Sequence, residues 1–224
     1  MKIGVLLPGC FTDSGDYLAD ARALDAAGVD SLWLADDVFD PWMVLSGIAA
    51  VTGRTRLAAP VSDLEGAAPD ALGRRMATLE RLSRGRLLAT VTAAARPADT
   101  ERLIACARRA GPAPLLLQGG GQGQSLLGAR LADGLVAVVD EPKQCHAAFD
   151  HARERRTRDA RTAPFELWTR VPAPDGREAW RALREAAEAV GATGIIVPAD
   201  PRLLDLLRNG DEEEDRSDLG LSQG

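Results

Sequence analysis

Short apolar runs rich in Val, Ile and Leu alternate along this chain with longer segments whose apolar residues recur at helical spacing. Strands that are buried on both faces read as continuous apolar runs, so this alternation favours βα units around a parallel sheet. Eight such runs are present. The predicted strands span residues 3–9, 31–36, 56–61, 86–92, 114–119, 135–140, 165–171 and 194–199.

The segments between these runs have the apolar spacing of helices, for example residues 16–28, 41–53 and 69–85. Eight strands, each followed by a helix, predict a compact (β/α)8 TIM barrel. An open doubly wound sheet is the competing arrangement, because spacing alone does not establish closure. Glycine is expected at the C-caps of the helices, where it accepts the left-handed backbone. The glycines in such places are Gly28, Gly53, Gly85, Gly111, Gly134 and Gly191.

The last residues differ in composition from the rest. Residues 209–224 contain six acidic side chains, one arginine and almost no large apolar residues, so we expect an acidic, disordered tail behind one barrel domain over residues 1–208. The formal net charge is -6, and the tail accounts for -5 of it. The barrel is therefore close to neutral, and no charge excess points to nucleic acid or a membrane surface.

Cysteine and histidine are too sparse to suggest a metal site. Cys10, Cys106 and Cys145 are far apart and form no CxxC pattern, which disfavours a zinc site or a disulfide framework and fits a reducing compartment. His146 and His151 are five residues apart and would not share a helix face. The apolar start of the chain is too short for a signal peptide or a membrane span. We therefore expect a cytoplasmic protein with no bound metal.

Residues 115–134, LLLQGGGQGQSLLGARLADG, contain the densest glycine cluster of the chain. Such a run is either a flexible linker or a backbone cradle for a phosphate. Its place after the fifth predicted strand and before a helix favours the cradle, because helix starts offer free NH groups to anions. It is neither GxGxxG, since Leu126 takes the third glycine position, nor a Walker loop. A tight turn without a ligand is the alternative.

The carboxyl ends of barrel strands meet at one rim, where such folds place their sites. Few acid or base candidates lie there. Asp36 and Asp37 follow the second strand, and at most one should face the barrel mouth. Other strand ends offer further carboxylates, but no spacing demands a catalytic pair. The sparse set suggests that a bound cofactor supplies any demanding chemistry. Further polar residues at the strand ends are Ser62, Thr90, Thr92, Gln118 and Arg170.

Three blocks, residues 21–61, 72–88 and 115–134, resemble successive blocks of the bacterial-luciferase-like flavin- and deazaflavin-dependent oxidoreductases. The resemblance implies a (β/α)8 barrel that binds FMN or coenzyme F420 at the rim. It implies that Gly119, Gly120, Gly121 and Gly123 approach the cofactor phosphate. It also implies that the second strand end faces the ring system or the substrate, with Asp36 as a cofactor contact and Asp37 as the catalytic candidate, and that Ser62 and Thr92 line the pocket.

The chain also departs from this family pattern. Asp37 stands where many members have histidine, and a carboxylate cannot donate a hydrogen bond as imidazole does. Residues 90–99 lack the usual glycine-rich turn, and residues 96–112 leave room for one helix where most members have a long insertion. A shorter connection predicts a shallower, wetter site, which favours hydride transfer or binding alone over oxygenation.

Two functions therefore stay open, with a third from the fold alone. The first is a flavin- or F420-dependent oxidoreductase or monooxygenase acting on a small organic substrate. The second is a non-catalytic flavin-binding relative or partner subunit of an active homologue. The third is a barrel enzyme for phosphorylated sugars or acids. The family resemblance implies a homodimer, or a heterodimer with a homologue. A subunit contact is expected near Trp42, Met43, Leu45 and Met76, although core packing is the commoner use of such residues.

Overall fold

The eight strands close into a parallel barrel. The computed structural model describes the whole chain except residues 36, 62–68 and 210–224. Each strand pairs with the next, and β8 pairs back onto β1 through Gly4 with Ile196 and Val5 with Val197. This confirms the predicted (β/α)8 barrel and excludes the open doubly wound sheet. Of the predicted acidic, disordered tail, residues 210–224 lie outside the described residues.

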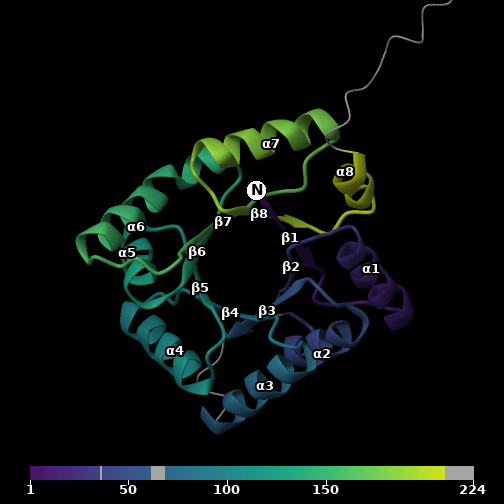
Figure 1. Ribbon diagram of the computed structural model, residues 1–224, viewed down its shortest axis with the longest axis horizontal. Coiled ribbons are helices and arrows are strands. Elements are labelled where there is room, and N and C mark those ends of the chain that lie inside the picture. Colours follow the sequence, from purple (N-terminus) through teal and green to yellow (C-terminus); the bar gives the residue numbers. More distant parts are fainter. Residues whose placement is uncertain (36, 62–68, 210–224) are drawn as a thin grey trace, which may run out of the picture.

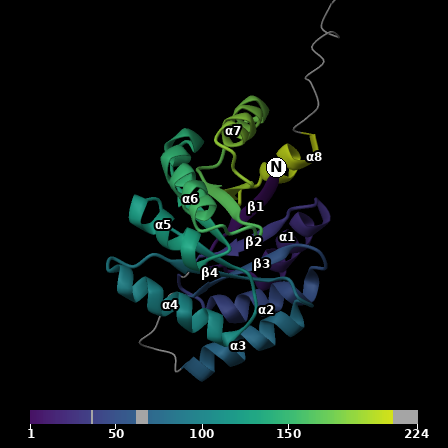
Figure 2. The ribbon, with the colours of Figure 1, turned by 60° about the vertical axis from the view of Figure 1, so that its left-hand side comes forward.

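Helices surround the barrel on all sides, one after each strand (Figure 1). Figure 2 shows the same ring of helices from an oblique direction. The bounds of the elements are β1 Lys2–Leu7, α1 Ser14–Ala26, β2 Ser31–Leu34, α2 Pro41–Val51, β3 Arg56–Val61, α3 Pro69–Leu82, β4 Leu87–Thr92, α4 Pro97–Ala110, β5 Leu115–Gln118, α5 Gln122–Leu131, β6 Gly134–Val138, the 3-10 helix η1 Pro142–Cys145, α6 His146–Arg158, β7 Glu166–Arg170, α7 Arg177–Ala189, β8 Gly194–Pro198 and α8 Leu203–Asn209.

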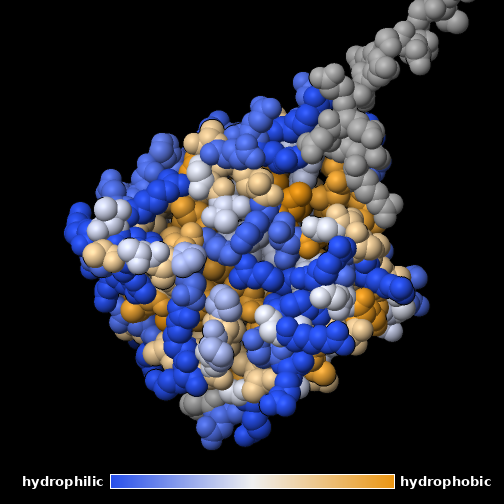
Figure 3. Space-filling model, viewed as in Figure 1, coloured by the Kyte–Doolittle hydropathy of each residue, from blue (hydrophilic) through white to orange (hydrophobic). Residues whose placement is uncertain are grey.

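The main core lies between the strands and the helices. Outward-facing strand residues such as Leu32, Leu57 and Leu117 are fully buried there against helix residues such as Leu45 and Phe149. Charged and polar side chains cover much of the face seen in Figure 3, with apolar residues visible between them. The apolar faces of the helices are thus buried against the sheet, as expected for a parallel barrel.

An ionic network closes the end of the barrel where the strands begin. Glu166, the first residue of β7, accepts hydrogen bonds from Lys2 at 2.7 Å and from Arg56 at 2.9 Å. It also accepts one from the indole NH of Trp168 at 2.9 Å. Burial raises the pKa of Glu166, but these partners outweigh burial and lower it below its usual range. The ion pairs of Glu166 with Lys2 and Arg56 thus join β7 to β1 and β3 at this end of the barrel.

Three of the expected glycine caps have the left-handed backbone. Gly28, Gly85 and Gly191 have φ values of 86°, 82° and 68°. The expectation for Gly134 was wrong, because it is the first residue of β6. A Cβ there would lie 2.3 Å from the carbonyl oxygen of Glu166, so close strand packing requires this glycine.

Asp25 joins α1 to the segment that leads into β3, and it makes stability depend on pH. Its carboxylate accepts hydrogen bonds from the NH groups of Gly53, Arg54 and Thr55 and from the Thr55 hydroxyl. Burial raises its pKa, but these four bonds outweigh burial and lower it from 3.8 to about 2. A lowered carboxyl pKa contributes stability above the unfolded value, and this stability is lost as the pH falls through the folded value.

We therefore expect the free energy of unfolding to fall by about 1–2 kcal/mol as the pH drops from above 4 to about 2, after allowance for solvent screening of this partly exposed group. Asp25→Asn should remove this part of the pH dependence, because an amide does not titrate. Urea unfolding at several pH values between 5 and 2 measures the effect. If the free energy of unfolding falls with pH as steeply in Asp25→Asn as in the unchanged protein, other carboxylates cause the acid sensitivity.

The apolar residues expected at a subunit contact mostly serve the core. Trp42, Leu45 and Met76 are buried, and only Met43 is exposed, at 72%. The dimer therefore stays a prediction. Among the helices that the structure describes, none is long and apolar enough to cross a membrane.

Candidate active site at the barrel mouth

Two tryptophans fill the middle of the barrel. Trp33 on β2 and Trp168 on β7 meet edge to face with ring centroids 5.7 Å apart, although their strands are not neighbours. They belong to a second, smaller cluster that is separate from the main core and includes Leu88 and Leu116. Contacts between distant strands identify this cluster as the barrel interior. The tryptophans form the floor beneath the C-terminal mouth.

The side chains above this floor follow from strand alternation. Successive residues point to opposite faces, so a residue two positions beyond an interior residue also points inward. Thr90 and Thr92 stand above Leu88 on β4, and Thr90 is buried with its hydroxyl 3.3 Å from the carbonyl oxygen of Ala59. The inner positions of the mouth are Pro60, Thr90, Thr92, Gln118, Val138, Arg170 and Pro198.

The mouth thus combines apolar walls with a few polar groups. The Val138 side chain is 51% exposed, which is unusual for an inward-facing apolar residue. Thr92 is exposed at the end of β4, and the connection from there to β5 contains one helix, α4. The short connection expected from the sequence is present.

Asp37 lies beside the end of β1. A Cβ placed on Gly9 would lie 2.4 Å from the Cβ of Asp37, so the two loops touch and Gly9 leaves the space for Asp37. The Asp37 side chain is exposed to solvent at the rim. Two other predicted site residues, Asp36 and Ser62, lie outside the described residues.

The glycine run forms the turn from β5 into α5. Gly119 is bound into the sheet, its NH donating to the carbonyl oxygen of Val136 at 2.9 Å, and Gly121 is the N-cap of α5. The linker interpretation is excluded, because these residues join a barrel strand to a barrel helix. The turn lies at the same end of the barrel as Thr92 and Arg170.

The backbone of this turn fits an anionic group. The NH groups at positions 122, 123 and 124 open α5, where no helical acceptor exists for them. A Cβ on Gly120 or Gly123 would meet no atom within 4 Å, so open space lies beside these NH groups. Free NH groups, the positive end of a helix dipole and open space are what phosphate binding at a helix start requires.

Gln124 occupies part of the same turn. Its side-chain oxygen accepts the NH of Gly121 at 3.0 Å, and a Cβ on Gly119 would collide with it at 2.6 Å. This bond caps α5 from within, as Gln at the third helical position commonly does. Of the four glycines expected at a phosphate, Gly119 therefore serves packing, Gly121 holds Gln124, and Gly120 and Gly123 face open space.

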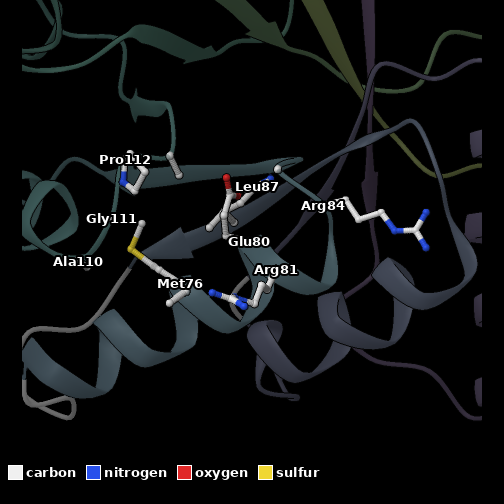
Figure 4. A pocket seen from close by; sticks show the side chains of 11 residues that line it. Met76, Glu80, Arg81, Arg84, Leu87, Ala110, Gly111 and Pro112 are labelled. Carbon is white, nitrogen blue, oxygen red and sulfur yellow. Dashed lines mark hydrogen bonds between the residues drawn. The ribbon is translucent and has the colours of Figure 1, made fainter.

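A separate cavity of about 460 Å³ lies at the opposite end of the barrel, near the start of β4 (Figure 4). Met76 and Leu87 give it an apolar wall, with Glu80 and Arg81 beside them. Glu80 is engaged, since its carboxylate accepts the NH of Leu87 at 3.3 Å. Barrel enzymes place their chemistry at the other end, so this cavity is not the candidate site.

Gln118 and Arg170 lie at predicted strand ends, but neither was among the predicted site residues. Both point inward because they stand two positions beyond Leu116 and Trp168. The alternation within each predicted strand indicates that these two side chains face the barrel interior. The predicted site residues instead followed the family resemblance, which pointed to other positions. No cluster of three or more possible metal ligands occurs among the residues that the structure describes.

Comparison with known proteins identifies relatives of this barrel. Residues 1–110 match the family model of luciferase-like monooxygenases. The F420-dependent tetrahydromethanopterin reductase from Methanopyrus kandleri is 11% identical, with a TM-score of 0.75 over 94% of this chain and 97% of that chain. An F420-dependent secondary alcohol dehydrogenase, solved with an F420–acetone adduct, is 12% identical, with a TM-score of 0.71 over 93% of this chain and 96% of that chain.

A monooxygenase shares the same architecture. The EDTA monooxygenase from Chelativorans sp. BNC1 is 15% identical, with a TM-score of 0.63 over 84% of this chain and 69% of that chain. At such identities the structural likeness shows the fold alone, and no curated protein sequence matches the chain. Residues 1–110, just under half of the chain, are thus similar to the luciferase-like monooxygenase family, and they form the first half of a closed (β/α)8 barrel.

Proposed function

We propose that this protein is a flavin- or F420-dependent oxidoreductase that transfers hydride between its cofactor and a small organic substrate. The observation that carries the proposal is the α5 turn. Its NH groups at positions 122–124, which have no acceptor within the helix, and the open space beside Gly120 and Gly123 suit a cofactor phosphate at the barrel rim. The two F420-dependent enzymes that share the fold support the choice of cofactor class.

The mouth suits a flat, partly apolar ring system next to that phosphate. Val138 offers an exposed apolar surface, and Trp168 and Trp33 form a rigid floor below. Thr92 can hydrogen-bond to a ring edge from β4, and we assign Asp36 and Ser62 to the same pocket from β2 and β3. The bound cofactor would supply the hydride acceptor or donor, which the side chains of this chain lack.

The short connection between β4 and β5 favours hydride transfer over oxygenation. Enzymes that activate oxygen need a closed, dry pocket, because water shortens the life of reactive intermediates. Here α4 is the only element between the two strands, and both Thr92 and Val138 are exposed. Hydride transfer between two stacked groups tolerates such an open mouth better.

Asp37 is the proposed proton acceptor. Oxidation of an alcohol releases a hydride from carbon and a proton from oxygen, and the proton needs a base within hydrogen-bond reach. The Asp37 carboxylate is exposed at the rim and is held against Gly9 rather than free on a long loop. A carboxylate can accept this proton, although it cannot donate a hydrogen bond as the histidine of many relatives does.

Asp37→Asn is expected to lower turnover by about 100-fold or more, because removing a general base has effects of this size. The affinity for the cofactor should change little. Stopped-flow absorbance of the cofactor under anaerobic conditions measures the rate. Asp20→Asn, an exposed carboxylate on α1, is the matched control. Equal rates in Asp37→Asn and the unchanged protein would remove Asp37 from the mechanism.

The proposed reaction is tested by supplying reductants to the cofactor-loaded protein without oxygen. A panel of small alcohols, hydroxy acids, NADH and NADPH is added while the visible absorption of the bound cofactor is followed. Bleaching by at least one donor, above the rate of free cofactor, is the expected result. A bound cofactor that stays oxidised with every donor would instead identify a non-catalytic relative.

A further inference from the structure

Arg170 stands at the mouth in a position that the proposed chemistry does not use. It is the last residue of β7, two positions beyond Trp168 and four beyond Glu166, and both of those residues point into the barrel. In the sheet, Val138 and Ile196 lie beside it on the two neighbouring strands. Arg170 therefore rises from the tryptophan floor into the mouth.

Its guanidinium group has no partner within the described part of the chain. Other inward or half-buried arginines are engaged: Arg56 pairs with Glu166, and Arg86 donates to the carbonyl oxygens of Thr52 and Thr55. Arg170 makes no such bond, although it is half-buried. Burial lowers its pKa, and no described charged group contributes to the shift. A partly desolvated cation is stabilised by a ligand that supplies an acceptor in place of the water it has lost.

The chemistry of the group indicates which ligand that is. A guanidinium presents a planar fork of NH donors that matches a carboxylate or phosphate with two parallel hydrogen bonds. The α5 turn follows β5, and β7 is two strands further round the barrel, which is roughly 10 Å at normal strand spacing. A phosphate at the α5 turn therefore lies beyond an Arg170 side chain that extends over Trp168 and not toward α5. If the α5 turn holds the cofactor phosphate, Arg170 is left for a second anion.

We propose that Arg170 binds the carboxylate of the substrate, so that the substrate is a small organic acid. This inference rests on the proposed function, because it assigns the cofactor phosphate to the α5 turn. A carboxylate on Arg170 would anchor the substrate above Trp168, with its apolar part against Val138. Arg170 would act by orienting the substrate, and the proton would still pass to Asp37.

The test compares a carboxylate with its neutral counterpart. Binding of benzoate and benzamide is measured by calorimetry, in the apo-protein and in the FMN- or F420-loaded protein. Benzoate should bind at least about 10-fold more tightly than benzamide, since hydrogen bonds to charged groups have this strength. Arg170→Gln should abolish the preference, and Arg170→Lys should restore part of it. Arg22→Gln, an exposed arginine on α1, should keep it.

Three results would overturn the assignment. The first is equal binding of benzoate and benzamide by the unchanged protein, and the second is a preference that survives in Arg170→Gln. The third is a loss of FMN affinity in Arg170→Gln with riboflavin affinity unchanged, which would assign Arg170 to the cofactor phosphate. If the unchanged protein binds neither FMN nor F420, the proposed function fails by itself, and the benzoate preference of the apo-protein still decides the role of Arg170.

Discussion

Gly120→Val should reduce the affinity for FMN and F420 by at least about 100-fold while the fold stays intact. The backbone at Gly120 is not left-handed, and a Cβ there meets no protein atom within 4 Å, so the protein can accommodate the valine. The added methyl groups would fill the space beside the NH groups that open α5. An anion could then no longer reach them, and several charge-assisted hydrogen bonds would be lost together. Quenching of tryptophan fluorescence on titration with each cofactor measures the affinity.

The same substitution at the far end of the barrel provides the control. Gly53 follows α2, its Cβ position is equally open, and its NH would still bond to Asp25 after substitution. Gly53→Val should therefore bind cofactor like the unchanged protein. Thermal unfolding of both variants shows whether the fold is intact. If Gly120→Val binds the cofactor as tightly as Gly53→Val does, the α5 turn does not bind the cofactor phosphate.

Gly194→Ala should destabilise the protein by about 3 kcal/mol, which is at the upper end of the cost of overpacking a core. A Cβ at Gly194 would lie 2.5–2.9 Å from three atoms of the Trp168 ring, and Trp168 is fully buried. The ring cannot move freely, because its NH bonds to Glu166 and its edge meets Trp33. For a chain of this length the melting temperature should fall by roughly 6–12 °C.

A second substitution shows whether the loss of stability comes from the collision with the Trp168 ring or from another effect of alanine in β8. Trp168→Phe removes the outer ring atoms that the new methyl group meets, so it should cost less stability in the Gly194→Ala background than in the unchanged protein. The difference is the coupling energy of the pair. Urea unfolding of the two single variants and the double variant gives this value. Strictly additive costs would show that Gly194 is not required by the tryptophan floor.

Much of the fold could be predicted from the sequence because each barrel unit carries its own pattern. The eight apolar runs correspond to the eight strands, with ends that differ by at most two residues. The spacing favoured a closed barrel but did not exclude an open sheet, because closure depends on the pairing of β8 with β1, at opposite ends of the chain. The cap at Gly134 was misplaced for a similar reason: the need for glycine there comes from Glu166 on the neighbouring strand, far away in sequence.

The candidate site was predictable only in part. The position of the glycine run after β5 was enough to place a phosphate-binding turn at the rim. The sequence pattern could not show which glycines face the phosphate. Gly121 bonds to Gln124 and Gly119 leaves space for it, and both contacts depend on the folded turn. Arg170 was visible at a strand end, but its lack of a partner among the described residues depends on where each of their carboxylates lies. The sequence alone does not show which carboxylates lie near Arg170.

The central claim is that this barrel binds a flavin-type cofactor by its phosphate at the α5 turn. It is tested most directly by calorimetric titration of the unchanged protein with FMN, riboflavin and F420. The expected result is saturable binding, with one site per chain, of FMN or F420, and binding of riboflavin at least about 10-fold weaker than that of FMN if FMN is the cofactor. Absence of binding by both FMN and F420, or equal affinity for FMN and riboflavin in a protein that does not bind F420, would contradict it.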